Sequence, residues 1–198
     1  ARVSLLGVDR EGIIDLDALQ HEVADDTLMV CIMAVNNETG VKQPLEGIAE
    51  LCRRNKLLFV CDGTQMAGRE RCDVAELGAD AFALSAHKFY GPKGVGALYL
   101  KRQRPELRPI QQISGGNHQH GLRSGTLHVA GIVGLGKTAE LAATHYWDRS
   151  AHISRLRNRF EHQLLDMEGL RINGSTRHRS YTTSNLTFPP GKAVSSLL

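Results

Sequence analysis

The sequence predicts an α/β fold in which helices cover both faces of a mostly parallel sheet. Three apolar runs have the length of strands, at 27–35, 57–61 and 81–84, and polar residues follow each of them. An unbroken apolar run is typical of a strand that is covered on both faces, as in a parallel sheet. The segments between the runs have about one crossover length and helical spacing, so the predicted order is β-α-β-α-β.

The elements around the first of these strands follow from local patterns. Residues 3–6 form a short apolar run, which predicts a strand. Residues 15–23 predict a helix because Leu16, Leu19 and Val23 fall on one helical face. Acidic residues open this segment, where the helix dipole favours negative charge.

The next helix is predicted at 44–55, with a proline in its first turn. Its inward-facing residues are Leu45, Ile48, Ala49 and Cys52. A short helix is predicted at 73–77. A glycine-rich turn follows the third strand, and the apolar run 95–100 predicts a strand that returns after it.

The pattern after residue 127 differs and predicts a second unit. Helices are expected at 127–143 and 147–167, and short strands of a different layer at 169–173 and 184–188.

We therefore predict a domain change near Tyr146. The large domain would occupy 1–145, and residues 146–198 would begin a smaller α+β C-terminal domain. Both ends of the sequence interrupt an element, so we expect a fragment that lacks the N-terminal part of the large domain and truncates the small one.

Composition excludes several classes of protein. The chain has 198 residues, 41% of them hydrophobic, and a net charge of +3. The basic cluster at 101–108 lacks aromatic residues and predicts a solvated loop, so we expect no nucleic-acid partner. The apolar runs are far shorter than the roughly 20 residues that span a bilayer, so we expect no membrane partner either.

The cysteines and the N-terminus indicate a compartment. No pair of the four cysteines has C-x-x-C spacing, and each lies in or beside an apolar segment. We interpret them as reduced structural thiols and expect no metal site. Because the N-terminus has no signal-peptide pattern, we expect a cytoplasmic protein.

Polar side chains follow each of the three predicted parallel strands. They are Asn37 after the first strand, Asp62 and Gln65 after the second, and Ser85, His87 and Lys88 after the third. Ligands of such sheets bind outside the carboxyl ends of the strands. Three polar strand ends together therefore predict a ligand site.

Lys88 is the residue around which this site is organised. On its own it could be a surface lysine, but a lysine after a buried strand can also act as a nucleophile towards a carbonyl. An aldehyde-bearing, phosphorylated pyridine cofactor needs such an amine, together with a carboxylate for the ring nitrogen and donors for the phosphate. Asp62, Ser85 and His87 could supply these groups. Asp62 could equally cap a helix, and His87 could be structural.

Four segments resemble the ordered motifs of a known enzyme family. They are VNNETG at 35–40, CDGTQ at 61–65, SAHKFYGPKG at 85–94 and RSGT at 123–126. Their residues and spacing resemble cysteine desulfurases of the nitrogen-fixation and iron–sulfur-cluster type. These enzymes belong to the class V aminotransferase family of fold type I pyridoxal-phosphate enzymes. The resemblance covers nearly the whole chain and implies that 1–145 is the pyridoxal-phosphate-binding large domain.

The resemblance implies a role for each residue at the strand ends. Lys88 would form the Schiff base with pyridoxal 5'-phosphate and later act as the proton-transfer base. Asp62 would pair with the pyridinium nitrogen and Gln65 would contact the phenolate oxygen. Ser85 and His87 would hold the phosphate.

Two further positions are implied in the same way. Asn37 would lie beside the cofactor and the substrate carboxylate. Thr126 would reach the phosphate of a neighbouring subunit, which implies a homodimer.

The implied activity converts L-cysteine to L-alanine and passes the sulfur as a persulfide to an acceptor protein, such as an iron–sulfur scaffold. A class V aminotransferase or a selenocysteine lyase is the alternative. None of the four cysteines matches the family's acceptor cysteine, so the fragment alone is expected to be inactive. An interaction module that has the fold but no activity is a further alternative.

Three residues depart from the family pattern: Ala86, Gly63 and His120. We expect the first two to be tolerated, whereas His120 puts a subunit contact in doubt.

One motif supports a rival function. Residues 131–138 (GIVGLGKT) match the P-loop pattern G-x-x-x-x-G-K-[ST]. A P-loop needs a strand immediately before its first glycine, and residues 128–130 are too short for one. Residues 127–143 are better explained as a single helix.

Overall fold

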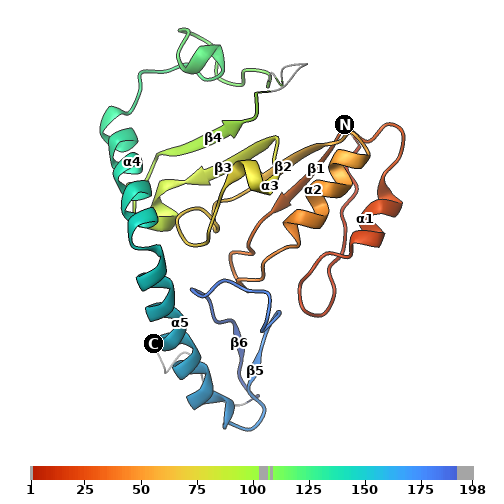
Figure 1. The fold of residues 1–198 in the computed structure, drawn as a ribbon, viewed down its shortest axis with the longest axis vertical. Helices are drawn as coiled ribbons and strands as arrows, with labels where there is room; N and C mark the ends of the chain where they lie inside the picture. The colour runs from red at the N-terminus through yellow and green to blue at the C-terminus, as the bar shows by residue number, and fades with distance from the viewer. Residues whose placement is uncertain (1, 103–106, 108, 191–198) are drawn as a thin grey trace.

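The main body of the computed structural model is a four-stranded sheet with helices packed against it (Figure 1). The structure describes residues 2–102, 107 and 109–190. The strands of the sheet are β1 (Met29–Met33), β2 (Leu58–Asp62), β3 (Ala81–Ser85) and β4 (Gly96–Leu100). The helices between them are α1 (Leu16–Glu22), α2 (Leu45–Arg54), α3 (Val74–Leu77) and the 3-10 turn η1 (Ala86–Phe89).

The sheet has the order β1-β2-β3-β4, with the first three strands parallel and β4 antiparallel to β3. This mostly parallel mixed sheet confirms the predicted α/β class. In register, Met33 lies opposite Asp62, and Ser85 lies opposite Gly96. The carboxyl ends of the three parallel strands therefore meet at one edge, and β4 starts from that edge.

The core lies between α2 and the adjacent face of the sheet. Ile48 and Cys52 of α2 are buried, as predicted, and belong to one hydrophobic cluster with Phe59 of β2 and Phe82 of β3. A buried carboxylate also ties the strands together, because the Phe59 amide donates to Asp80 Oδ2 over 2.9 Å. The predicted helix boundaries hold to within a residue or two, and Pro44 stands at the N-cap of α2.

The predicted strand at 3–6 is wrong. These residues have no strand hydrogen bonding, and the first pairing in the chain is an isolated bridge between Val8 and Ile14. Val3 and Leu5 are 76% and 93% exposed. An apolar run becomes a strand only where another strand offers it a ladder, and among the described residues 3–6 has no such neighbour.

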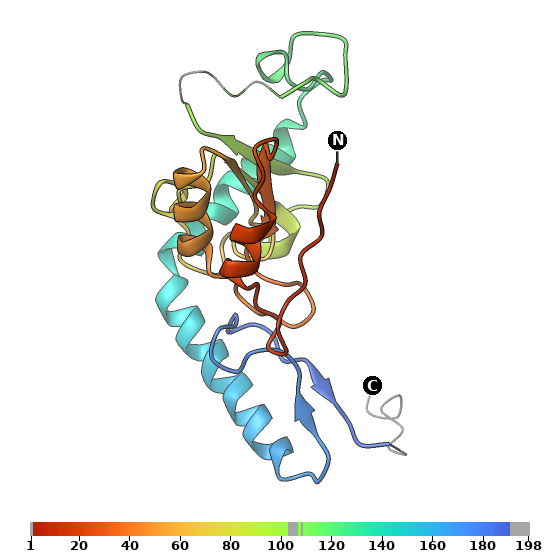
Figure 2. The same cartoon turned by 90° about the vertical axis from the view of Figure 1, so that its right-hand side faces the viewer.

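The C-terminal part consists of α4 (Val129–Thr144), α5 (Tyr146–Leu165), β5 (Arg171–Ile172) and β6 (Leu186–Thr187). Before it, a 3-10 turn, η2 (Gln119–Gly121), lies in the excursion after β4. Strands β5 and β6 form their own antiparallel pair, as predicted for a different layer. Figures 1 and 2 show α4 and α5 following one another, with β5 and β6 beside α5. The domain change near Tyr146 stays a prediction.

The chain segment around residue 180 returns to the main body. The Ser180 amide donates to the Gly40 carbonyl over 2.7 Å, and the Lys42 amide donates to the His178 carbonyl over 2.8 Å. Within the described ranges, no helix has both the length and the hydrophobicity required to cross a bilayer.

Candidate active site

Asp62 ends β2 at the sheet edge where the three parallel strands finish. Its side chain is exposed, and Oδ1 accepts a hydrogen bond from the Thr64 amide over 2.9 Å. This bond orders the turn that follows the strand. The alternative that Asp62 caps a helix is wrong, because residues 64–69 form a turn and the next helix, α3, is capped by Asp73. Asp62 thus presents a carboxylate at the edge of the sheet.

Lys88 stands on η1, which begins immediately after β3 at the same edge. Two buried residues of this turn, Ala86 and Phe89, anchor it in the protein, while Lys88 is half-buried. Ser85 Oγ and His87 Nδ1 are 2.9 Å apart, so one hydrogen-bonds to the other. A hydroxyl, an imidazole and an amine are therefore gathered within four consecutive residues, next to the strand that Asp62 ends.

Gln65 lies in the turn after Asp62, and its amide has a defined orientation. Arg69 Nη1 donates to Gln65 Oε1 over 2.9 Å. Because the carbonyl oxygen is engaged as an acceptor, the Nε2 group remains to act as a donor. The sequence interpretation missed Arg69, although its i, i+4 spacing from Gln65 could have indicated the contact.

Asn37 is exposed in a short loop after β1. The preceding residue, Asn36, has a structural role, because its Oδ1 accepts hydrogen bonds from the Glu38 and Thr39 amides, each over 2.9 Å. This local turn fixes the backbone on both sides of Asn37.

Thr126 lies in the segment between η2 and α4, outside the sheet. Since β4 runs antiparallel, it carries the chain from the carboxyl edge to the opposite edge of the sheet. The excursion after β4 extends beyond the sheet before α4 begins (Figure 1), and Thr126 is exposed within it. Its role towards a neighbouring subunit stays a prediction.

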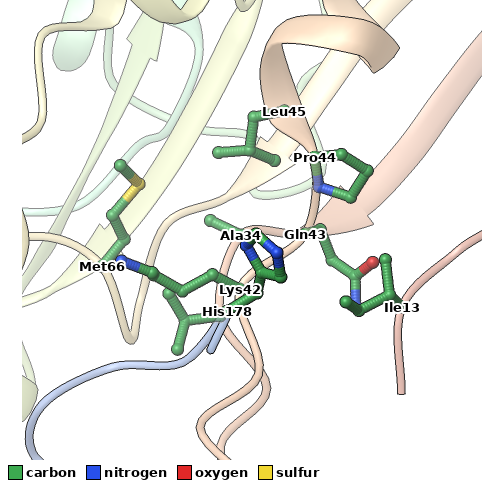
Figure 3. A pocket seen from close by; sticks show the side chains of 9 residues that line it. Ile13, Ala34, Lys42, Gln43, Pro44, Leu45, Met66 and His178 are labelled. Carbon is green, nitrogen blue, oxygen red and sulfur yellow. The ribbon is translucent and has the colours of Figure 1, made fainter. Parts of the chain in front are cut away.

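The pocket in Figure 3 lies beside this edge, next to the segments that hold Asn37 and Gln65. It has a volume of about 310 Å³ and lies between the end of β1 and the start of α2. Met66 and Ile13 lie on opposite sides of it (Figure 3). Its lining includes Lys42 and His178 but none of the predicted site residues.

The cysteines have the character of structural thiols. Burial is the main cause that raises the pKa of Cys52 to about 11 and that of Cys61 to about 12. Burial likewise raises the pKa of Cys72 to about 11. A thiol acts as a nucleophile only as its thiolate, so these three groups are inert near neutral pH. Cys31 is exposed on β1.

The P-loop-like segment is helical, as predicted. Residues 131–138 all lie inside α4, and from Ile132 onward their backbone amides donate within the helix and cannot wrap a phosphate. The Lys137 amine forms an exposed ion pair with Glu140 over 2.7 Å. Gly134 allows α4 to approach Pro92, since a β-carbon there would be 2.8 Å from the proline ring. The nucleotide-binding alternative is therefore wrong for this segment.

Comparison with known proteins identifies the family. The family model described as aminotransferase class-V matches residues 1–197. Cysteine desulfurase IscS of Mannheimia succiniciproducens is 41% identical over 94% of this chain and 46% of its own length. The mitochondrial cysteine desulfurase of Saccharomyces cerevisiae is 42% identical over 94% of this chain and 37% of its own length.

Solved structures share the fold. A NifS-like protein superposes with a TM-score of 0.90 at 34% identity, covering 98% of this chain and 53% of the other. A NifS-like protein from Rickettsia africae gives a TM-score of 0.89 at 26% identity, covering 97% of this chain and 53% of the other. The chain spans about half the length of the proteins it matches. Because the family model matches residues 1–197, the chain belongs to the class V aminotransferase family.

Proposed function

We propose that this chain is the cofactor-holding part of a pyridoxal-phosphate-dependent cysteine desulfurase. The observation that carries the proposal is the placement of Lys88. This half-buried residue follows β3 at the edge where the neighbouring strand, β2, ends in Asp62. The family match and the names of the relatives support the same function.

The donor groups at this edge fit pyridoxal phosphate. The cofactor presents an aldehyde, a ring nitrogen, a phenolate oxygen and a phosphate. Lys88 offers an amine for the aldehyde, and Asp62 a carboxylate for the ring nitrogen. Gln65 is oriented as a donor for the phenolate oxygen by Arg69. The hydrogen-bonded pair Ser85 and His87 offers donors for the phosphate.

Each residue then has a definite task. Lys88 Nζ would hold the cofactor covalently and, once released, would move a proton at the substrate carbon. The negative charge of Asp62 keeps a proton on the ring nitrogen. The bound cofactor supplies an electron sink for the reaction. Asn37 would lie beside the cofactor and the substrate carboxylate.

The substrate that we propose is L-cysteine, which leaves as L-alanine while its sulfur passes as a persulfide to an acceptor. None of the four cysteines is assigned as that acceptor, since Cys52 and Cys61 are buried, Cys72 is half-buried, and the pKa of each of these three thiols is raised. An iron–sulfur scaffold is the kind of protein that would receive the sulfur. Thr126 would complete the phosphate site of a second subunit in a homodimer. Reduced thiols fit a cytoplasmic location.

Cofactor binding is tested by chemical trapping. The chain is incubated with pyridoxal phosphate, reduced with borohydride and mapped by peptide mass spectrometry. A pyridoxyl group on Lys88 is expected, and Lys88→Arg should remove it. Lys93, an exposed lysine of the same loop, is the internal reference. Labelling of Lys88 no greater than that of Lys93 would contradict the proposal.

The reaction is tested in a full-length context. The matching segment of the Mannheimia enzyme is replaced by this chain, and alanine and sulfide formed from cysteine are measured. The same chimera carrying Lys88→Ala is the control. Amino transfer to a keto acid without sulfide would indicate an aminotransferase instead, and alanine formed only from selenocysteine would indicate a selenocysteine lyase.

A further inference from the structure

Arg149 of α5 contacts both turns that carry the candidate cofactor residues. Its Nη2 donates a hydrogen bond to the carbonyl of Gly68, in the turn that also holds Gln65. Its guanidinium carbon lies 5.9 Å from the centre of the Tyr90 ring, and Tyr90 ends the η1 turn that holds Lys88. One side chain therefore links the segment after β2 to the segment after β3.

These two segments are in direct contact and are closely packed at Gly68 and Phe89. A β-carbon at Gly68 would be 2.6 to 2.8 Å from atoms of Phe89, the residue after Lys88. Gly68 also has φ = +67°, which favours glycine. The position of η1 therefore depends on how the Gly68 turn is held.

Tyr90 has an unfavourable backbone conformation that its surroundings must maintain. Its φ is +73°, in the left-handed region that a tyrosine rarely adopts. Burial does not hold the ring, since Tyr90 is 72% exposed. The Gly91 amide closes the turn by donating to the Ala86 carbonyl over 2.9 Å. The cation–π contact with Arg149 restrains the exposed Tyr90 ring.

Arg149 also lies near Tyr181. Burial raises the pKa of Tyr181, and the neighbouring Arg149 partly offsets that rise. The buried Tyr181 hydroxyl has no hydrogen-bond partner among the described residues, so the contacts that position Arg149 are those with Gly68 and Tyr90.

We propose that Arg149 is a positioning residue that fixes the Lys88 turn against the Gln65 turn, an inference that rests on the proposed function. It touches neither the cofactor nor the substrate and acts through Tyr90 and Gly68. Without it, the Lys88 amine would sample more positions relative to Asp62 and Gln65. A covalent reaction with the cofactor aldehyde is sensitive to such loosening, because it depends on orientation.

The test measures how fast Lys88 is trapped, with the pyridoxal phosphate and borohydride method, relative to Lys93 in the same molecule. Arg149→Ala is expected to lower this ratio about tenfold. Arg149→Lys retains the charge and a donor for Gly68, and should recover part of the loss. Arg159→Ala removes an exposed arginine of the same helix and should change nothing. Thermal unfolding of each variant is recorded in parallel.

A second variant removes the same link from its other end. Tyr90→Leu should lower the Lys88 to Lys93 ratio by a similar factor, and Arg149→Ala should add little to it, because the two residues act as one unit. An unchanged ratio in Tyr90→Leu or in a folded Arg149→Ala overturns the inference, as does a loss in Arg159→Ala as large as that in Arg149→Ala. If the wild-type chain is not trapped at Lys88 at all, the proposed function fails instead.

Discussion

The ring of Phe82 occupies the space that a β-carbon on Gly63 would take. Phe82 is almost fully buried in the centre of the core. Gly63 cannot move away, since its amide donates to the Ala83 carbonyl over 2.9 Å and its carbonyl accepts from the Met66 and Ala67 amides. The turn that leads from Asp62 to Gln65 is therefore built around a glycine because the neighbouring strand carries a phenylalanine.

Gly63→Ala should destabilise the chain by about 1–3 kcal/mol through overpacking. The φ of Gly63 does not lie in the left-handed region, so steric overlap alone causes the loss. In Phe82→Leu the space opens, and adding Gly63→Ala to that variant should cost much less than it does in the wild type. Urea denaturation of the two single variants and the double variant measures the coupling. Additive effects would show that the overlap is relieved elsewhere.

Asp62→Asn should remove the negative charge of this side chain while keeping its hydrogen bond with the Thr64 amide. The asparagine Oδ1 can still accept from the Thr64 amide, so the unfolding free energy should change by less than about 0.5 kcal/mol. The loss of the negative charge should weaken pyridoxal phosphate binding about tenfold or more. Isothermal titration with the cofactor measures this. Asp73→Asn is the matched control, because Asp73 makes a similar bond to the Ala75 amide. Equal cofactor affinity in the Asp62→Asn and Asp73→Asn variants would show that Asp62 is not part of the cofactor site.

Local patterns were sufficient to predict most elements of the fold. The apolar runs gave β1, β2 and β3, and the helical spacing gave α1 and α2, because their burial is determined by residues nearby in the sequence. The strand predicted at 3–6 failed, since strand formation depends on a partner that a local pattern cannot reveal. The polar strand ends lie at one edge, as predicted, because parallel strands bring their carboxyl ends together; their role in binding stays a proposal.

The contacts that support the site were not predictable in the same way. Arg149 and Gly68 are 81 positions apart, and no spacing rule connects them. The expectation that Gly63 is a tolerated departure was incomplete for the same reason. The ring of Phe82, on another strand, leaves no space for a β-carbon at position 63. Such pairings arise only when the elements pack, so the sequence pattern contains no signal for them.

Lys137→Ala should change neither the stability of the chain by much nor its ability to bind nucleotides. The ion pair of Lys137 with Glu140 is about 60% exposed on both sides, so its loss should cost about 0.5 kcal/mol or less. Neither the wild type nor the variant should bind ATP with magnesium, because the segment is helical. Calorimetric titration measures the binding. Tight ATP binding by the wild type that disappears in the variant would revive the P-loop interpretation.

The four cysteines should differ sharply in reactivity at pH 8. A thiol with a pKa of about 11 has roughly one thiolate in a thousand at that pH, and Cys61 has fewer still. Cys31, which is exposed, should be alkylated by iodoacetamide first. Peptide mass spectrometry before and after unfolding in urea measures each site. Rapid alkylation of Cys52 or Cys61 in the folded chain would contradict their burial.

Glu161→Gln should destabilise the attachment of α5 to the segment near residue 180. Glu161 and Arg179 form a buried bidentate ion pair with distances of 2.7 and 2.5 Å. Burial alone would raise the pKa of Glu161, but hydrogen bonds from Arg179 and Ser184 outweigh burial and lower it. Removing one partner of a buried pair leaves the other charge uncompensated, so the expected loss at pH 7 is about 3–5 kcal/mol.

The pH dependence of this loss follows from the lowered pKa. A carboxyl whose pKa is lower in the folded state contributes stability above its unfolded pKa of about 4.3 and loses it as the pH falls further. The difference between wild type and Glu161→Gln should therefore be constant from pH 7 to about pH 5 and shrink below about pH 4. Urea unfolding across this range measures it. Glu50→Gln, which removes an exposed partner of Arg53, is the control and should show little difference at any pH. A difference that stays constant down to pH 3 would mean that the charge on Glu161 contributes nothing, and that packing alone accounts for its effect.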